Sequence, residues 1–331
     1  MKNSYDYQRE IAQHVKPSMA YTGENFETWK AMAREKLRQL LGMEKYLCPG
    51  TSAIIEYDVQ RSGFREIRFL METEQGYFVP CHLWLPDGIK KPPVMICLQG
   101  HSPGMHISMG RAMDSNAPLP ADEGDRDFSV RAIKEGFAAV ALEQRNFGEL
   151  MGEGRCLYAS LTAMLQGRTT LGERVHDVMV CIDTLEKQFA HLVDTDRISC
   201  MGNSGGGTAT AYAAALEDRI RLAMPSCAMC TYKDSIAGVP HCACNYVPHI
   251  MEYFDMDDIM AMAAPKYFIQ VSGLNDPENF PVDGAKEVFE KGSSVYAQLG
   301  IKDRCALVIG NGGHRFYADD TWPLLHKMLG Y

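Results

Sequence analysis

Between residues 202 and 206 the sequence reads Gly202-Asn203-Ser204-Gly205-Gly206. An apolar, strand-like run, 197–201, precedes this stretch, and a run of small residues typical of a helix, 208–216, follows it. A serine with glycines two residues before and two residues after it, between a strand and a helix, is the pattern of a nucleophile elbow. The chain turns so sharply at such a serine that side chains at the glycine positions would collide with neighbouring backbone.

The motif alone leaves a second interpretation open. A glycine-rich turn between a strand and a helix can also cradle a phosphate. The lysine of a P-loop and the third glycine of a dinucleotide fingerprint are both missing here. Because 29 of the 331 residues are glycine, a chance match is not rare, and the rest of the chain has to decide.

Composition limits the classes of function. A hydrophobic content of 46% and a charged content of 23% are ordinary for a soluble globular protein. The net charge of −9, without a lysine or arginine cluster, argues against a nucleic-acid partner. The polar start, 1–10, does not look like a signal peptide, and no apolar run is long enough for a membrane span. Eleven cysteines without a secretion signal indicate reduced thiols, so we expect a cytoplasmic protein.

The first half of the chain predicts a helix and then an antiparallel meander. An amphipathic pattern predicts a helix over Phe26 to Leu41 that ends at Gly42. Three strand-like segments follow, with turns at Ser62-Gly63 and Gln75-Gly76, and they cover 53–60, 65–72 and 77–86. We divide the chain into an N-terminal helical extension, 1–50, and a catalytic domain, 51–331.

From Pro93 onward, apolar strands alternate with amphipathic helices, which predicts an α/β fold with a mostly parallel, doubly wound sheet. The expected strands are 94–98, 138–142, 197–201, 221–224, 267–271 and 306–309. The expected helices are 128–134, 173–189, 208–216, 282–296 and 322–328. Two stretches, 102–124 and 146–170, are too long for simple connections and are candidates for active-site walls or lids.

Ligands of open α/β sheets bind beyond the carboxyl ends of the strands, so the residues that follow each strand are the candidate site. Ser204, Asp276 and His314 each follow a predicted strand, in the chain order Ser, Asp, His that this architecture uses. A serine hydroxyl needs a base to take its proton, and histidine titrates in the range that suits this task. The aspartate would fix the histidine tautomer and stabilise the imidazolium.

A tetrahedral oxyanion requires preorganised donors. We expect one from the backbone N–H of Gly205 and another from the loop after 94–98, through the N–H of His101 or Gly100. The ring of His101 could instead act directly on substrate. Arg145, after strand 138–142, is a candidate to bind a substrate carboxylate, although such an arginine more often ties loops together.

Two further alternatives remain. Glu278 and Asp283 rival Asp276 as the acid, and Asp276 is preferred because it lies nearest the strand end. The pattern Cys227-x-x-Cys230 followed by His241-Cys242-x-Cys244 suggests zinc, but the second pair has only one intervening residue. We therefore expect no metal there and thiols that line or support the pocket edge.

These stretches resemble the α/β-hydrolase superfamily, and within it the dienelactone-hydrolase-like and acetyl-xylan-esterase-like branch. The resemblance covers about residues 50 to 331 and rests on the elbow and on Gln99-Gly100-His101, Gly273-Leu274-Asn275-Asp276, Gly313-His314, Asn245-Tyr246-Val247-Pro248 and Tyr253-Phe254-Asp255-Met256. It implies a sheet of about eight strands and an ester-hydrolase activity. Dienelactone hydrolases proper use a cysteine nucleophile, whereas this elbow holds Ser204, which favours a serine carboxylesterase.

We therefore expect a hydrolase of short-chain, acetyl-type esters, those of carbohydrates included, that works through an acyl-enzyme on Ser204 without a cofactor. The expected partner is a small-molecule or carbohydrate ester, with no nucleic acid or membrane, and self-association into a homo-oligomer stays open. A serine peptidase or amidase of the same fold and a non-catalytic binding protein are the rival functions.

Overall fold

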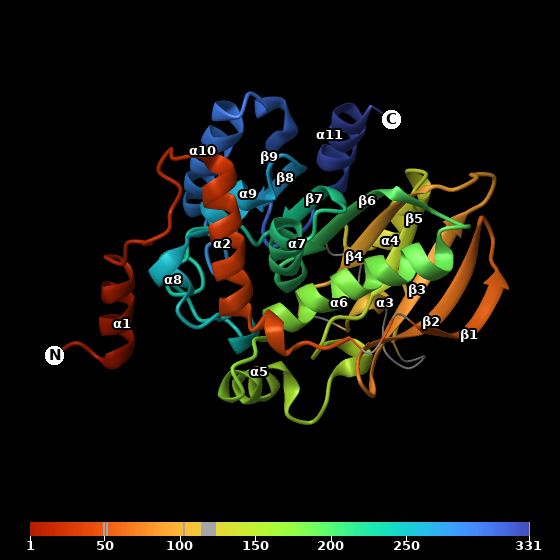
Figure 1. Cartoon of the computed structure of the whole chain (residues 1–331), viewed down its shortest axis with the longest axis horizontal. Helices are drawn as coiled ribbons and strands as arrows, with labels where there is room; N and C mark the ends of the chain where they lie inside the picture. Colours follow the sequence, from red (N-terminus) through yellow and green to blue (C-terminus); the bar gives the residue numbers. More distant parts are fainter. Residues whose placement is uncertain (49, 51, 102, 114–123, 331) are drawn as a thin grey trace.

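A nine-stranded sheet runs through the computed structural model, which describes residues 1–48, 50, 52–101, 103–113 and 124–330 (Figure 1). Its strand order is β1-β2-β3-β5-β4-β6-β7-β8-β9. The strands are β1 Ala53–Gln60, β2 Phe64–Glu74, β3 Tyr77–Pro86, β4 Pro93–Leu98, β5 Ala138–Leu142, β6 Asp194–Asn203, β7 Ile220–Ser226, β8 Tyr267–Gly273 and β9 Cys305–Gly310. Every strand expected from the sequence is present, one more than the resemblance implied.

The sheet is antiparallel at one end and parallel through the rest. β1, β2 and β3 form the predicted meander, and β3 also pairs antiparallel with β5. From β5 to β9 all neighbouring strands are parallel. The carboxyl ends of β4, β6, β7, β8 and β9 therefore meet at one edge, which is where the predicted site residues lie.

Helices cover both faces of the sheet, and each face has its own apolar core. Helices α2, α6, α7, α9 and α10 contribute to the larger core on one face, and α4 and α11 contribute to the core on the other. Their bounds are α2 Phe26–Leu41, α4 Phe128–Lys134, α6 Thr170–Thr184, α7 Gly205–Leu216, α9 Met256–Ala263, α10 Val282–Gln298 and α11 Ala318–Leu329. Burial on both faces explains why β4 and β5 are apolar along their whole length.

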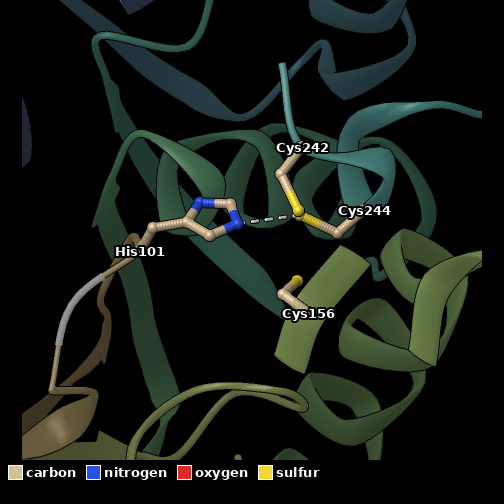
Figure 2. Close-up of side chains that lie close together, drawn as sticks. All are labelled: His101, Cys156, Cys242 and Cys244. Atoms are coloured by element: carbon tan, nitrogen blue, oxygen red, sulfur yellow. Dashed lines mark hydrogen bonds between the residues drawn. The ribbon is translucent and has the colours of Figure 1, made fainter. Parts of the chain in front are cut away.

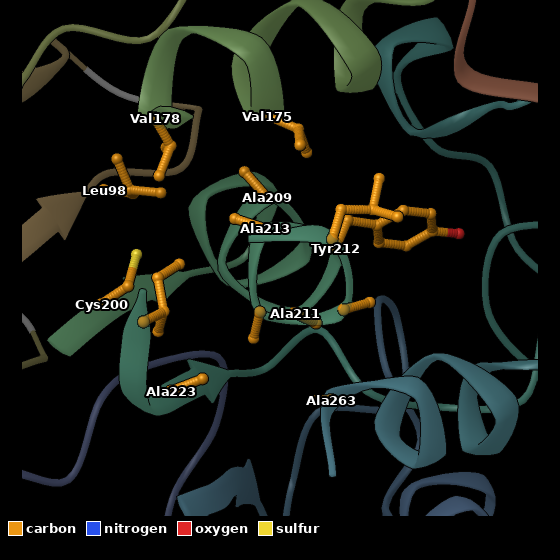
Figure 3. Close-up of a cluster of buried hydrophobic side chains, with 14 of the residues drawn as sticks. Leu98, Val175, Val178, Cys200, Ala209, Ala211, Tyr212, Ala213, Ala223 and Ala263 are labelled. Atoms are coloured by element: carbon orange, nitrogen blue, oxygen red, sulfur yellow. The ribbon is translucent and has the colours of Figure 1, made fainter. Parts of the chain in front are cut away.

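Helix α7 lies at the centre of the larger core, and all of its residues are buried. Figure 3 shows its alanines facing side chains of β4, β6 and β7, with Val175 and Val178 of α6 above them. Small side chains are needed here because α7 packs against strands and against α6 and α9 at once. The small-residue run after Ser204 thus keeps the helix close to the sheet and fixes where the elbow lies.

The predicted helices are present with small shifts at their ends. Helix α2 has the expected bounds, and Gly42 ends it in the left-handed conformation at φ 72°. Helix α6 begins earlier than expected because the Thr169 side chain accepts a hydrogen bond from the N–H of Gly172. Its last expected turn, Leu185–Phe189, is a π-helix.

In the described part of the chain five α-helices were not predicted, namely α1 Ser4–Ala12, α3 Met105–Ser108, α5 Arg155–Leu165, α8 Ile250–Tyr253 and α9. Helix α5 lies within 146–170, so that stretch is not loop throughout. Helix α5 exposes several large apolar side chains, namely those of Leu157, Tyr158, Leu161 and Leu165. Because apolar residues lie on its exposed side as well, the sequence lacks the apolar–polar periodicity that would predict a helix. Of the other candidate lid, 102–124, residues 102 and 114–123 lie outside the described part of the chain.

The N-terminal helices differ in how they meet the rest of the chain. Helix α2 packs into the larger apolar core through buried residues that include Trp29, Ala33, Leu37 and Leu41. Helix α1 has no buried residue. The division at residue 50 stays a prediction. Among the described residues, none of the helices has the length and apolar character required to cross a bilayer.

Candidate active site

Ser204 lies in a strained turn between β6 and α7. Its φ of 57° and ψ of −124° are unusual for a residue with a side chain. A Cβ on Gly202 would lie 2.8 Å from the Leu98 carbonyl oxygen, and a Cβ on Gly206 would overlap that same oxygen. A Cβ on Gly202 would also overlap the backbone of Gly206, so both glycines are required by the tightness of the turn and its closeness to β4, which is the geometry of the predicted elbow.

Asp276 and His314 meet at the ends of β8 and β9. The N–H of Asn275 donates to the Gly312 carbonyl oxygen at 2.8 Å, which ties the two loops together. A Cβ on Gly273 would overlap the Gly313 carbonyl oxygen, so only glycine permits this approach. The His314 Nδ1 then lies 2.6 Å from the Asp276 Oδ2.

The surroundings of the pair hold both side chains in place. The Asp276 side chain is 2% exposed and also accepts a hydrogen bond from the Asn279 side chain at 2.9 Å. The Phe280 ring stacks on the His314 ring with an interplanar angle of 14°. The two rival acids, Glu278 and Asp283, are exposed. The structure therefore brings Asp276, and neither rival, to the histidine.

Ser226 at the end of β7 joins the serine loop to the histidine loop. Its carbonyl oxygen accepts a hydrogen bond from the N–H of Ser204 at 2.8 Å, and its hydroxyl donates to the Arg315 carbonyl oxygen at 3.1 Å. The His314 Nδ1 is engaged by Asp276, which leaves its Nε2 as the nitrogen able to accept a proton from Ser204.

The loop after β4 runs directly beside Ser204. A Cβ on Gly100 would lie 2.8 Å from the Ser204 Cβ, so the backbone at Gly100 passes next to the nucleophile candidate. Gly205 is the first residue of α7, where N–H groups have no acceptor within the helix and the helix dipole is positive. The residues predicted to supply the oxyanion donors, Gly205 and the Gly100–His101 segment, thus both lie next to Ser204.

Glu143, after β5, supports the loops beside the site and was not singled out from the sequence. Its fully buried carboxylate accepts hydrogen bonds from the N–H groups of Met105 and Glu149, both at 3.1 Å. Burial raises the pKa of Glu143 to about 7. Gly104 and Gly148 pack so tightly against this carboxylate that a Cβ on either would overlap it.

Arg145 lies in a buried ion-pair network beside these loops. Its guanidinium donates to both oxygens of Asp177, at 2.7 and 2.8 Å, and to Glu74 at 2.6 Å. The guanidinium also lies over the Tyr77 ring. This is the arrangement of an arginine that ties elements together, which was the alternative to binding a substrate carboxylate.

The cysteines predicted as one group lie in two places. Cys227 is buried beside Asp276 and His314, and burial, together with the Asp276 charge, raises its pKa to about 11. Cys230 donates to the Pro281 carbonyl oxygen. Cys242 and Cys244 instead lie with His101 and with Cys156 of α5, a residue that the sequence gave no reason to join to them.

The comparison with curated proteins gives one partial likeness. A Bacillus subtilis (strain 168) protein named "Putative hydrolase YtaP" is 25% identical over 191 residues, 56% of this chain and 62% of that protein. This chain therefore spans less than two thirds of that relative's length. No family model matches the chain.

Solved structures resemble the chain over nearly its whole length. A structure described as a "putative acetyl xylan esterase" from Bacteroides fragilis NCTC 9343 has a TM-score of 0.75 at 19% identity, covering 94% of this chain and 82% of that one. Methylesterase BT1017 has a TM-score of 0.74 at 18% identity, covering 99% and 69%. A glucuronoyl esterase from Solibacter usitatus has a TM-score of 0.67 at 14% identity, covering 96% and 94%. The sheet and these likenesses show that the chain has the α/β-hydrolase fold, as the sequence resemblance implied.

Proposed function

We propose that the chain is a serine carboxylic-ester hydrolase with Ser204, His314 and Asp276 as its catalytic triad. The observation that supports this most strongly is the 2.6 Å contact between the His314 Nδ1 and the buried Asp276 carboxylate. Hydrogen bonds of Ser226 connect the His314 loop to the Ser204 turn. The named esterases and hydrolase that the chain resembles point to the same class of reaction.

In the first half-reaction the Ser204 Oγ bonds to the ester carbonyl carbon while the His314 Nε2 takes the serine proton. The carbonyl electron pair moves to oxygen, and the N–H of Gly205 and an N–H of the Gly100–His101 segment donate to that oxyanion. Asp276 holds the His314 tautomer and stabilises the imidazolium. When the oxyanion collapses, the C–O bond breaks and the alcohol leaves with the proton from His314.

In the second half-reaction water attacks the acyl-enzyme, and His314 accepts its proton. The second tetrahedral intermediate uses the same two donors; when it collapses, the bond from the carbonyl carbon to the Ser204 Oγ breaks, His314 returns the proton to that oxygen, and the acid leaves. No step needs a metal or organic cofactor.

The proposed substrates are short-chain, acetyl-type esters, those of carbohydrates first. This choice rests on the family resemblance and on the name of the Bacteroides fragilis structure. The name of the glucuronoyl esterase points instead to esters in which a sugar acid is the acyl part, and the name of the methylesterase points to methyl esters. A panel of acetylated sugars and methyl uronates separates the two substrate classes.

Labelling with a fluorophosphonate, followed by mass spectrometry, tests the nucleophile. We expect one label per chain on Ser204, none on the Ser204→Ala variant, and normal labelling of Ser294→Ala, whose hydroxyl is exposed on α10. Ser204→Ala should also lower kcat for an aryl acetate by several orders of magnitude. Undiminished turnover by Ser204→Ala would refute the proposal.

Two comparisons separate the rival functions. An ester and an amide of the same acyl group distinguish an esterase from a peptidase or amidase of the same fold. A protein that neither takes the label nor hydrolyses any ester on the panel would be a non-catalytic binding member.

A further inference from the structure

Three thiols and an imidazole converge on one point beside the candidate active site. Figure 2 shows the side chains of Cys156, Cys242 and Cys244 directed toward the His101 ring. Their four ligand atoms, one nitrogen and three sulfurs, all lie within 4.8 Å of one another. The His101 Nε2 lies 3.3 Å from the Cys244 Sγ, and all of these cysteines are free.

The cluster joins segments that are distant in the sequence. His101 follows β4, Cys156 belongs to α5, and Cys242 and Cys244 lie at the 3₁₀ turn η4, Ala243–Asn245. That turn is the one regular element in the long connection between β7 and α8, among the described residues. The apolar cluster at this point is small, consisting of Phe147, Cys156 and Cys244 with Cys242 at its edge, and it is separate from the two large cores. Hydrophobic packing alone therefore gives little support to this junction.

The donor set is the one that zinc prefers in structural sites. Three thiolates and one imidazole form a closed Cys₃His tetrahedron with Zn–S distances of about 2.3 Å and Zn–N distances of about 2.0 Å. In such a tetrahedron the ligand atoms lie roughly 3.5 to 3.8 Å from one another. The observed spacing within 4.8 Å requires only small side-chain adjustments to reach these values.

The charge of the surroundings favours a bound dication with three thiolates. The Arg174 guanidinium is 1% exposed and donates to the Cys156 Sγ at 3.6 Å. Its other hydrogen bonds go to the Arg145 carbonyl oxygen, and among the described residues no carboxylate pairs with it. A buried, unpaired cation is costly. One Zn²⁺ with three thiolates carries a net charge of −1, which balances Arg174.

We propose that His101, Cys156, Cys242 and Cys244 bind one structural zinc ion that clamps these loops around the active site. Each thiol releases its proton to solvent as its sulfur binds the metal. The four protein ligands fill the tetrahedron, so the ion has no open position for substrate or water.

The metal would also position the loop that supplies the oxyanion donor, and this part rests on the proposed function. The Nδ1 of His101, the ring nitrogen that would not bind the metal, faces the elbow. A Cβ added to Gly205 would lie 3.8 Å from it. Zinc on Nε2 fixes the proton of neutral His101 on Nδ1 and holds the ring in one orientation. The backbone of His101, next to Gly100 and Ser204, is held with it.

Metal analysis of the full chain, purified under reducing conditions, tests the site without any assay of activity. We expect one zinc per chain in the wild type and in Cys48→Ser, whose thiol is exposed outside the cluster. Cys156→Ser and Cys242→Ser should each lose most of the metal. Cobalt added to chelator-stripped wild type should give a thiolate-to-cobalt charge-transfer band and the strong visible bands of tetrahedral coordination. This reconstitution does not depend on whether a variant folds.

Three results would overturn the zinc site. The first is a protein without metal that has all eleven thiols reactive after unfolding. The second is a disulfide within the cluster, seen as two fewer thiols. The third is zinc that stays bound in both cysteine variants.

The positioning role has its own test. Metal removal should lower kcat about 10- to 100-fold with little change in KM, and unchanged kcat would overturn the positioning role alone. Bound zinc in a protein without esterase activity would refute the proposed function and leave the metal site standing.

Discussion

The His314 imidazole and the Asp276 carboxylate lie 2.6 Å apart, although 38 residues separate them in the sequence. Their loops meet because β8 and β9 are adjacent parallel strands and because Gly273 and Gly313 allow the backbones to touch. The pair is therefore a product of the sheet topology, and its function can be tested without disturbing that topology.

Asp276→Asn should leave the fold intact and disable the histidine. The amide would favour the wrong imidazole tautomer and could not stabilise the imidazolium, so we expect kcat to fall by up to about ten-thousand-fold. Turnover of an aryl acetate by the purified variant measures the effect.

Glu278→Gln and Asp283→Asn are the matched controls for this variant. Both acids are exposed on the same connection, so we expect each variant to keep kcat near the wild-type value. A crippled Glu278→Gln or Asp283→Asn beside a nearly normal Asp276→Asn would show that the acid is assigned to the wrong residue.

Cys227 offers a test of a cysteine nucleophile. Its thiol lies with Asp276 and His314 within 4.8 Å, but burial raises its pKa to about 11. The thiolate is the reactive form of cysteine, so a buried neutral thiol should react slowly. We expect iodoacetamide at pH 8 to modify the exposed Cys48 and to leave Cys227 unmodified, as read by peptide mass spectrometry. Rapid alkylation of Cys227 with matching loss of esterase activity would favour it over Ser204.

Gly206→Ala tests the steric origin of the elbow. The new methyl group would overlap the Leu98 carbonyl oxygen, so we expect a loss of about 1–3 kcal/mol or more in the free energy of unfolding. Gly152→Ala is the control, because a Cβ there meets nothing within 4 Å and should change that free energy by less than about 0.5 kcal/mol. Urea unfolding of both variants makes the comparison, and equal stability of the two would count against a steric role for Gly206.

Apolar runs and turn glycines in the sequence predicted most of the sheet. Strands such as β4 and β5 are buried on both faces and so read as unbroken apolar runs. The turn glycines Gly63 and Gly76 adopt φ values of 88° and 75° and so mark the ends of the meander strands. Helices α5 and α9 escaped prediction because α5 exposes apolar residues, whereas α9 is short and buried on nearly every side.

The candidate site was predictable only where it follows strand ends. Ser204, Asp276 and His314 each come directly after a strand, so the parallel order of the sheet brings their loops to one edge. Cys156 lies on an unpredicted helix, and its approach to His101 and Cys242 depends on how the long connections fold. The spacing pattern did include Cys242 and Cys244, but it grouped them with Cys227 and Cys230, which lie elsewhere, and not with Cys156 or His101.

Glu143→Gln should change how stability depends on pH. Burial raises the pKa of Glu143 to about 7 in the folded protein, against 4.5 for an ordinary glutamate. Between these two values the folded state binds more protons than the unfolded state, so the contribution of this group to the free energy of unfolding falls as pH rises and is constant above about pH 7.

The glutamine variant lacks this titration. We therefore expect the stability of Glu143→Gln relative to wild type to rise by up to about 3 kcal/mol between pH 4.5 and 7.5, as measured by urea unfolding at several pH values. Parallel stability curves for the two proteins would mean that the Glu143 carboxyl titrates normally and that the loops beside Ser204 do not rest on a protonated acid near neutral pH.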